Sequence, residues 1–460
     1  MQIVWDERHG KILVEFLKEI NNNGIKYFIL RGYEGLPNNN PSKDVDIMID
    51  IGTLADAEAI LKTVFAKHGI EYFYPVVYGH AHCYVGMNIS EQLSIHIDLI
   101  EGYVSKGFEV FTFEELYKHV VQYNGMNVLD DLMNGIMLVV YKIFGYHHAK
   151  LKPSYQADIF KAQLQSSQEF RSIISRIAGE KLGNKICDLI AKKDFDAVVA
   201  LEPEFTKALK KYTFKARPLN TIRYSVEFLW QKLNRIIFNY KKYAKTFAVI
   251  APDGTGKTTF LDALLDELNF YYVNDENDRR FHVYHFRPEI LPNLGQVGEK
   301  AGVMKQDTDF TKPHRSKPAN PLSSLIRIAY YTLDYIIGWQ KCVRNDVHYD
   351  RYTIFDRYSY DFIVDPRRTR LNLPESVRKF FVKLTPQPKI VFCLDALPDV
   401  IYNRKQELSL EEITRQISEY RKLAVANTVR FKVINAEQSP RKMASEAAAI
   451  VIGRYTEKLK

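Results

Sequence analysis

The sequence predicts an α/β protein with three parts. We expect an α+β domain over residues 1–120, a helical region over 121–245, and, over 246–460, a parallel β-sheet with helices on both faces. The 460 residues suffice for two or three domains that each bury a core. Helix and strand signals mix up to about residue 120 and then give way to mostly helical periodicity. From residue 246 onward, apolar strands alternate with helices, which is typical of a parallel sheet.

The N-terminal domain begins with an amphipathic helix. Apolar residues recur at helical spacing from Ile12 to Ile20, and the cluster Asn21-Asn22-Asn23-Gly24 is a typical helix stop. The apolar run Tyr27–Leu30 predicts a first strand, and the alternating stretch Val45–Ile51 predicts a second.

Further along, residues 80–98 predict a β-hairpin that turns near Asn88–Glu91. The expected pairing sets His82 opposite His96 and His80 opposite Asp98, on one face of the sheet. Such a cluster would bind a metal ion or a phosphate. The alternative is that these are ordinary polar positions on a half-buried sheet.

The C-terminal part contains five candidate strands separated by helical stretches. They are Phe247–Ile250, Phe281–His285, Thr353–Phe355, Ile390–Leu394 and Phe431–Ile434. Short apolar runs of this kind are typical of parallel strands that are buried on both faces.

The net charge of +9 comes from one segment. The chain has 64 Lys and Arg residues against 55 Asp and Glu residues. Between Lys210 and Lys245 there are ten basic residues and one acid, Glu227, and ten minus one accounts for the whole excess. The rest of the chain is neutral, so the composition does not indicate a general nucleic-acid binder.

Other bulk features exclude several classes of protein. The four cysteines are widely spaced without a CxxC pair, which fits a reducing cytosol and neither a zinc ribbon nor a disulfide framework. No run approaches the roughly 18 apolar residues that span a bilayer. The N-terminus carries charges where a signal peptide needs an apolar stretch. We therefore expect a cytoplasmic protein, membrane-associated at most.

The basic segment also contains an amphipathic helix. Its apolar residues are spaced by 4, 3, 4, 3 and 4 and are Ile222, Val226, Leu229, Leu233, Ile236 and Tyr240. Peripheral contact of residues 222–245 with an anionic membrane is one interpretation. A linker helix packed between two catalytic domains is another, and nucleic-acid binding is the least favoured of the three.

The strongest motif is TFAVIAPDGTGKTT at 246–259, which is followed by the helical run Phe260–Leu268. A strand that leads into a glycine-rich loop and a helix is the setting of a phosphate-binding P-loop. The cofactor-binding residues expected there are Gly254, Thr255, Gly256, Lys257, Thr258 and Thr259. Lys257 would contact the β- and γ-phosphates of ATP and Thr258 would bind Mg²⁺, while Ala251 replaces the first glycine of the motif.

Two further segments carry candidate residues for phosphoryl transfer. The strand Tyr352–Phe355 ends in Asp356 and Arg357, an acid that could hold Mg²⁺ and a cation that could bind an acceptor phosphate. Arg404 follows the strand at 389–394 and would stabilise charge on the transferred group. The alternatives are a strand-end aspartate that caps its loop and a solvated helix face.

Residues 246–460 resemble the thymidylate kinase branch of the P-loop nucleoside monophosphate kinases. The matching segments are PDGTGKTT (252–259), FDRY (355–358), LDALPDVIYNRKQE (394–407), ISEYRKLA (417–424) and VINAEQSP (433–440). The resemblance implies that Arg404 lies in a lid over ATP, that Asp253 and Arg357 face the acceptor, and that the segment near Asn435 lies by the adenine.

The chain departs from that family where the acceptor would bind. SYDFIVDPRRTR (359–370) follows FDRY in place of the segment that grips the pyrimidine, and HFRPEILP (285–292) stands in place of an Arg-Glu-Pro-Gly-Gly loop. Together with KPHRSKP (312–318), these segments are similar to thymidylate kinase-like proteins encoded with surface-polysaccharide enzymes. The resemblance thus implies a donor site for ATP and leaves the acceptor open.

Three carboxylates mark a second candidate site. Asp44 and Asp46 share one face of a strand, and Asp98 lies in the alternating stretch Leu93–Ile100. Three carboxylates on adjacent strands are what a two-metal site needs. Residues 10–120 resemble the nucleotidyltransferase fold of the polymerase-β superfamily, except that Tyr33 follows Gly32 where that family has Gly or Ser. A surface turn is the alternative.

The sequence therefore predicts a phosphotransferase that uses ATP and Mg²⁺ and acts on a small acceptor, with a second, nucleotidyltransferase-like site. The expected acceptor is a sugar, a sugar phosphate or a nucleotide used in surface-polysaccharide assembly. A genuine nucleoside monophosphate (dTMP) kinase and a non-catalytic, ATP-gated regulatory module are the alternatives. The oligomeric state is not predicted.

Overall fold

The structure, a computed structural model, describes residues 5–41, 43–105, 107–143, 151–234, 237, 245–273, 280–292 and 319–459. The chain forms two compact units. The N-terminal unit contains Gln2–Leu233 together with Thr456–Lys460, and the P-loop unit contains Asn234–Tyr455. The helices predicted after residue 120 therefore belong, up to Leu233, to the same unit as the strands before them.

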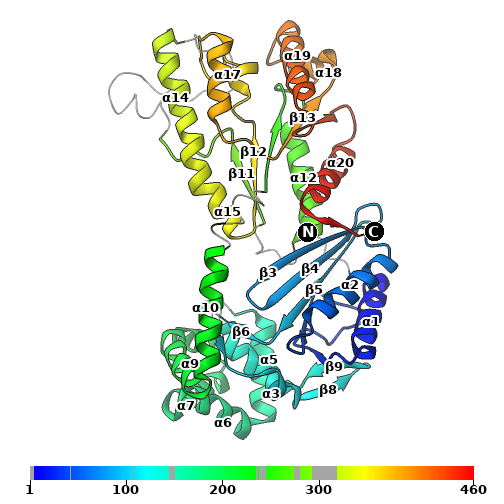
Figure 1. Cartoon of the computed structure of the whole chain (residues 1–460), viewed down its shortest axis with the longest axis vertical. Helices are drawn as coiled ribbons and strands as arrows, with labels where there is room; N and C mark the ends of the chain where they lie inside the picture. The colour runs from blue at the N-terminus through cyan, green and yellow to red at the C-terminus, as the bar shows by residue number, and fades with distance from the viewer. Residues whose placement is uncertain are drawn as a thin grey trace. The chain divides into compact units, whose positions relative to one another are not determined.

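The N-terminal unit is built on a mixed sheet of eight strands in the order β15-β3-β4-β5-β2-β1-β9-β8. Figure 1 shows β3, β4 and β5 side by side in this sheet. The strands are β1 (Tyr27–Ile29), β2 (Asp44–Ile49), β3 (Tyr72–Tyr78), β4 (Ala81–Asn88), β5 (Leu93–Glu101), β8 (Val120–Tyr123), β9 (Met126–Leu129) and β15 (Glu457–Lys458). A separate pair is formed by β6 (Val104–Ser105) and β7 (Phe108–Glu109). The parallel pairs are β2 with β5 and β1 with β9.

Helices cover both faces of this sheet. Alternate strand residues point to opposite faces and pack in two separate hydrophobic cores. Ile29 and Ile47 pack with α1 (Glu7–Asn22) and α2 (Leu54–Lys67). Phe28 and Met48 pack with the helices that follow β9. Those helices are α4 (Asp131–Met137), the π-helix η1 (Leu138–Ile143), α5 (Pro153–Gln165), α6 (Ser167–Ala178), α7 (Glu180–Ala191), α8 (Phe195–Ala200) and α9 (Glu202–Ala216), after the short α3 (Phe113–Tyr117).

The predicted hairpin exists, but its predicted register is wrong. In β4 and β5, His82 lies opposite Leu99 and His96 lies opposite Val85. The two histidines therefore lie on opposite faces of the sheet, because their cross-strand positions differ by an odd number of residues. The physical reason is the length of the connection, since residues 89–92 form a four-residue loop. The expected His/Asp cluster does not form.

The last helix of this unit, α10 (Pro218–Asn234), carries the predicted amphipathic pattern with its apolar stripe in solvent. Ile222, Val226, Leu229 and Leu233 are 51–60% exposed, whereas Thr221 and Tyr224 are the buried residues of the helix. Ile236 and Tyr240 lie outside the described residues. Contact of this stripe with an anionic membrane stays a prediction.

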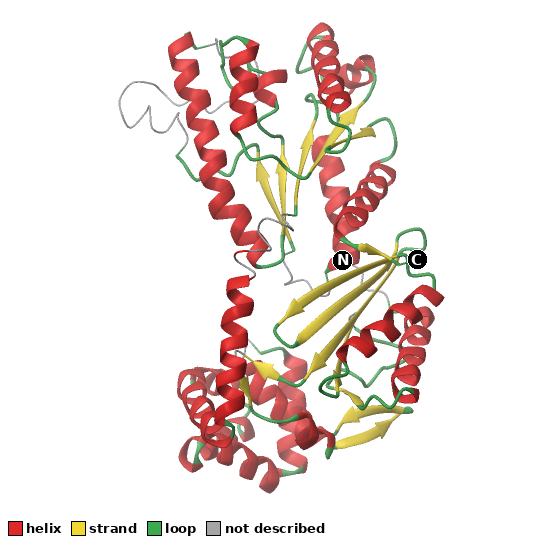
Figure 2. Cartoon of the chain, in the orientation of Figure 1, coloured by secondary structure: helices red, strands yellow, loops and turns green. Residues whose placement is uncertain are grey.

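The P-loop unit contains a parallel five-stranded sheet in the order β11-β12-β10-β13-β14. Its strands are β10 (Thr246–Ile250), β11 (Phe281–His285), β12 (Tyr352–Asp356), β13 (Ile390–Asp395) and β14 (Phe431–Asn435). The five predicted strands are thus confirmed to within two residues at each end. The mixed α/β class is confirmed with them, and Figure 2 shows strands and helices in both units.

Helices flank this sheet on both faces as well. Phe392 on β13 packs edge-on against Phe260 of α12 (Lys257–Tyr272), while its neighbours Val391 and Cys393 join a core with Tyr420 of α19 (Leu410–Ala426). The other helices of the unit are α14 (Pro321–Gly338), the π-helix η3 (Trp339–Val343), α15 (Arg344–His348), α16 (Asp361–Val364), α17 (Glu375–Leu384), α18 (Pro398–Arg404) and α20 (Pro440–Tyr455). The carboxyl ends of the strands meet at one edge, where ligands bind in open parallel sheets.

Among the described residues, no helix combines the length and the apolar character needed to cross a bilayer.

Candidate active sites

The P-loop unit places a glycine-rich turn between its central strand and α12. β10 is buried throughout, and α12 begins at Lys257 with the left-handed Gly256 as its cap residue. The free N–H groups and the dipole of this helix N-terminus favour an anion. Gly254 also has a positive φ of 82°, and a Cβ there would come within 3.1 Å of Lys405 Cβ and 3.2 Å of the Ile401 carbonyl. Glycine is therefore required at 254 for two independent reasons.

Lys257 is buried inside this turn. Its ammonium donates to the carbonyl oxygens of Ala251 at 3.0 Å and Pro252 at 2.8 Å, and it lies 3.4 Å from Asp253 Oδ1. Burial, and secondarily the charge of Arg357, lower the pKa of Lys257. An anion beside this ammonium would offset both effects, which is the role that a phosphate would take.

The other predicted cofactor-binding residues surround the same turn. The Thr255 hydroxyl is buried and donates to Pro252 at 3.0 Å, whereas Thr258 and Thr259 are exposed on the first turn of α12. Arg404, at the end of α18, donates to the carbonyls of Thr255 at 3.4 Å and Ala436 at 3.0 Å. The structure therefore places Arg404 beside the P-loop, and its role toward ATP stays a prediction.

Asp356 ends β12, directly beside β10 in the sheet. Its Oδ2 accepts a hydrogen bond from His285 Nδ1 at 3.1 Å, while its buried Oδ1 has no hydrogen-bond partner among the described residues. Burial favours a higher pKa for Asp356, but the hydrogen bond and charge of His285 outweigh it and hold the pKa below its usual value. An ionised carboxylate with one uncommitted buried oxygen fits a Mg²⁺ ligand or a ligand of its bound water.

Arg357, next to Asp356, is 4% exposed and has a φ of 73°. That backbone conformation is uncommon outside glycine and costs about 1–3 kcal/mol, so the surrounding contacts must hold it. The guanidinium donates to Asp253 and, at 3.0 Å, to Asp361 Oδ2. The predicted pair Asp253 and Arg357 is therefore in direct contact.

The structure adds two ion pairs that the sequence did not single out. Arg368 also donates to Asp253. Arg287 donates to Asp334 at 2.8 Å, and both side chains are buried, at 5% and 0% exposure. Asp334 was detectable in principle, because it is the one acid in the mostly apolar stretch 321–338, and a lone acid in such a helix is usually paired.

A cavity of ≈ 320 Å³ opens at the carboxyl ends of β13 and β14. Asp395, Asn435 and Glu437 are among its lining residues, and Arg421 bridges its rim by donating to both oxygens of Asp395 at 3.0 and 3.1 Å. The resemblance stated above implied the adenine near Asn435. Asn435 lies two residues after Val433, which pairs with Cys393 of β13. The cavity provides space at that position.

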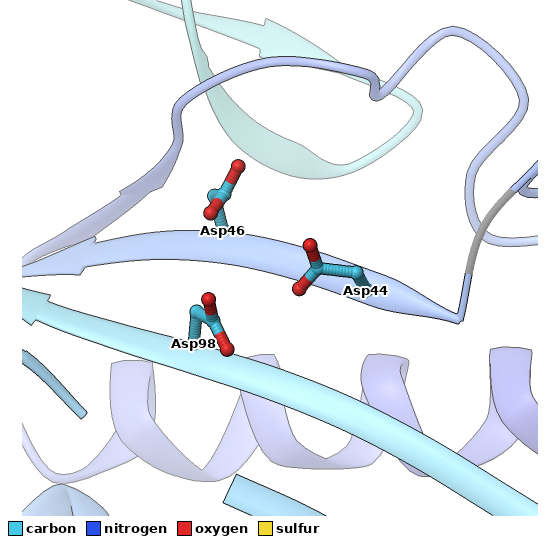
Figure 3. A group of neighbouring side chains, drawn as sticks. All are labelled: Asp44, Asp46 and Asp98. Atoms are coloured by element: carbon cyan, nitrogen blue, oxygen red, sulfur yellow. The ribbon is translucent and has the colours of Figure 1, made fainter. Parts of the chain in front are cut away.

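In the N-terminal unit, the three carboxylates singled out in the sequence, Asp44, Asp46 and Asp98, lie together. β2 and β5 are parallel neighbours, and Asp46 lies directly opposite Asp98. One carboxylate oxygen from each of the three residues lies within 4.8 Å of the other two. Figure 3 shows the three carboxylates turned toward one another. Carboxylate oxygens are the ligands that Mg²⁺ prefers.

The electrostatics of this triad fit a cation. Burial, followed by the charges of Asp98 and Asp46, raises the pKa of Asp44 well above its usual value. A divalent cation would relieve that repulsion. One cation is already present, since Arg31 Nη2 lies 2.5 Å from Asp46 Oδ2. Burial lowers the pKa of a second basic residue, Lys142, to about 8.

The departure at Tyr33 has a structural explanation. Gly32 has a φ of 66°, as a tight loop requires, while Tyr33 is buried and its hydroxyl donates to the Leu129 carbonyl at 3.2 Å. Tyr33 also packs against Tyr123 with ring centroids 5.3 Å apart. Tyr33 thus joins the core beside β9.

Comparisons with known proteins give little beyond this geometry. No protein-family model matches the chain. No curated protein sequence matches it either. Among solved structures, the chain is similar to the thymidylate kinase of Ehrlichia chaffeensis at 16% sequence identity and a TM-score of 0.31, over 45% of this chain and 97% of that one.

Proposed function

We propose that the P-loop unit is an ATP-dependent phosphotransferase that acts on a small acceptor, namely a sugar, a sugar phosphate or a nucleotide, in surface-polysaccharide biosynthesis. The observation that carries the proposal is the buried Lys257 in a glycine turn, next to a strand that ends at Asp356 and is followed by Arg357. Phosphoryl transfer depends mainly on positioning and on stabilising charge, and these residues supply both.

Each residue has a definite part in this reaction. The bond between the γ-phosphorus and the β–γ bridging oxygen breaks, ADP leaves with the electron pair, and an acceptor oxygen bonds to phosphorus. A hydroxyl acceptor releases its proton to solvent, whereas an ionised phosphate oxygen has no proton to release. Lys257 and Arg404 stabilise the charge of the phosphates, and Asp253 and Arg357 orient the acceptor. Thr258 and Asp356 would hold Mg²⁺, which supplies charge neutralisation on the β- and γ-phosphates.

The test uses the full-length protein with γ-labelled ATP and a panel of acceptors. The panel contains hexoses, hexose 1-phosphates, nucleosides and nucleoside monophosphates, including dTMP. We expect label on an acceptor with wild type, none with Lys257→Ala, and normal transfer with the matched control Lys379→Ala, whose side chain is 54% exposed on α17. Selective labelling of dTMP would support a nucleoside monophosphate kinase. ATP binding without any labelled product would support a regulatory module.

A second function is favoured by the carboxylate triad of the N-terminal unit. We propose that Asp44, Asp46 and Asp98 form a nucleotidyltransferase-like centre that would hold Mg²⁺ and direct attack on an α-phosphate. The support is the convergence of their oxygens within 4.8 Å on adjacent strands. A cation bound there would lower the repulsion that raises the pKa of Asp44.

α-Labelled ATP tests this centre separately, because only nucleotidyl transfer moves that label to an acceptor. Asp98→Asn should abolish α-label transfer and leave γ-label transfer intact. Asp56→Asn is the matched control, since Asp56 is an exposed residue of α2. Transfer of α-label that persists in Asp98→Asn would contradict the proposal.

A further inference from the structure

Arg368 lies in the turn after α16 and points back to the P-loop. One terminal nitrogen donates to Asp253, and Nε donates to Asp365 Oδ2 at 3.3 Å. The backbone N–H of Arg368 also donates to Asp365 Oδ1 at 3.3 Å. The Arg368 side chain is 25% exposed, whereas Asp365 is 2% exposed. A buried carboxylate thus fixes this guanidinium from behind.

Arg357 is held in the same way from the other side. Its Nη1 donates to Asp361 Oδ2 at 3.0 Å, and the other oxygen of Asp361 accepts from the Tyr420 hydroxyl at 2.8 Å. Asp361 is fully buried. Arg357 and Arg368 then reach different oxygens of the same residue, Asp253.

Two guanidinium groups therefore enclose one carboxylate, and each has its own buried carboxylate behind it. If Asp253 leaves, each cation still has the carboxylate behind it, Asp361 for Arg357 and Asp365 for Arg368. A phosphate monoester carries up to two negative charges and three acceptor oxygens, and it binds the planar fork of arginine with two parallel hydrogen bonds. It therefore fits between two guanidinium groups better than a single carboxylate does.

We propose that Arg357 and Arg368 form a clamp for a phosphate monoester on the acceptor. Asp253 occupies the clamp until the acceptor binds and then turns to orient the acceptor beside the bound phosphate. The inference rests on the proposed phosphotransferase function and narrows its acceptor to phosphorylated compounds, excluding neutral sugars. Arg368 is then a substrate-binding residue, in the segment where the chain departs from the thymidylate kinase pattern. The alternative is an ion-pair network that only holds the turn at 365–370 against the P-loop.

Acceptor kinetics separate these two roles. Arg368→Ala should raise the KM for a phosphorylated acceptor by about 10- to 100-fold, the range expected for a charge-assisted hydrogen bond. Arg368→Lys should restore only part of the loss, because an ammonium lacks the planar fork. Arg367→Ala is the matched control, since the adjacent Arg367 is exposed, and its KM should equal that of wild type. An unchanged KM in Arg368→Ala, or equal transfer to a hexose and to its phosphate, would overturn the clamp.

A binding experiment keeps the clamp testable if no acceptor is labelled. The protein is saturated with a non-hydrolysable ATP analogue, and inorganic phosphate is titrated by calorimetry. We expect one phosphate site in wild type, weakened at least 10-fold in Arg368→Ala and retained in Arg367→Ala. Phosphate binding without γ-label transfer would support the clamp and refute the phosphotransferase. If the folded variants Arg368→Lys and Arg368→Ala both bind phosphate as tightly as wild type, the clamp is refuted and the phosphotransferase proposal is not.

Discussion

The loop at 286–292 depends on one buried carboxylate, Asp334. This residue of α14 accepts hydrogen bonds from Arg287 Nη1 at 2.8 Å and from the backbone N–H groups of Glu289 at 3.1 Å and Leu291 at 2.6 Å. Both Phe286 and Glu289 have positive φ values, 63° and 56°, so the loop needs tertiary contacts to keep its conformation. Asp334→Ala removes the acceptor for all three donors at once.

The expected cost follows from the burial of the pair. Removing one partner of a buried ion pair costs about 3–5 kcal/mol, because the remaining charge stays desolvated. At 1.36 kcal/mol per factor of ten, the lower value corresponds to a roughly 150-fold increase in local opening. Asp334→Asn keeps one acceptor oxygen without the charge, and we expect a smaller effect from it.

Hydrogen exchange measured by mass spectrometry reads this opening directly. The peptide that contains Glu289 and Leu291 should exchange about 100-fold faster in Asp334→Ala, and peptides from α1 should be unchanged. Asp399→Ala, at an exposed position in the first turn of α18, is the control. Exchange in the loop within about 3-fold of wild type would refute the reasoning, since the loop would then be held by other contacts.

Three further outcomes are expected. Gly254→Ala should reduce affinity for a fluorescent ATP analogue at least 10-fold. It should also destabilise the P-loop unit more than Gly24→Ala destabilises the N-terminal unit, because both glycines have positive φ but only Gly254 has close neighbours. Equal effects of the two substitutions in urea unfolding would contradict this. Asp98→Asn should weaken Mn²⁺ binding by about 10-fold or more in electron paramagnetic resonance titrations, and unchanged binding would exclude the triad as a metal site. Asp6→Ala should destabilise α1 by about 1 kcal/mol at neutral pH, because Asp6 accepts from the N–H groups of Arg8 and His9 at the helix start. Burial favours a higher pKa for Asp6, but the hydrogen bonds from Arg8 and His9 outweigh it and depress the pKa. The contribution of Asp6 to stability is therefore present above the unfolded pKa of 3.8 and should shrink as the pH falls below it. An effect of Asp6→Ala that is constant from pH 7 to pH 2.5 would contradict the assignment.

The strands of the P-loop unit were readable from the sequence for a physical reason. Parallel strands buried on both faces appear as short apolar runs, such as Phe247–Ile250, and each run is bounded by a helix. The triad was readable as well, because Asp44 and Asp46 alternate with apolar residues and Asp98 lies in a second alternating strand. Both signals are local in sequence.

The parts that could not be predicted depend on distant residues. The register of β4 against β5 is set by the length of the loop at 89–92, which an alternating pattern does not specify. The side chain of Arg368 meets Asp253 across 115 positions in the chain. Nothing in the run of basic residues Arg367, Arg368 and Arg370 shows which one turns inward, because that choice is made by the turn and by the buried Asp365.

The route of the chain between the units has a consequence for protein engineering. After Tyr455 the chain returns to the N-terminal unit, where Glu457 and Lys458 pair with β3 and the Leu459 N–H donates to the Glu71 carbonyl at 2.9 Å. In architectural terms, residues 234–455 are an insertion between the penultimate and last strands of the host domain. A protease site engineered at 238–244 would cut one of the two covalent connections, and the fragments should still elute together in size-exclusion chromatography.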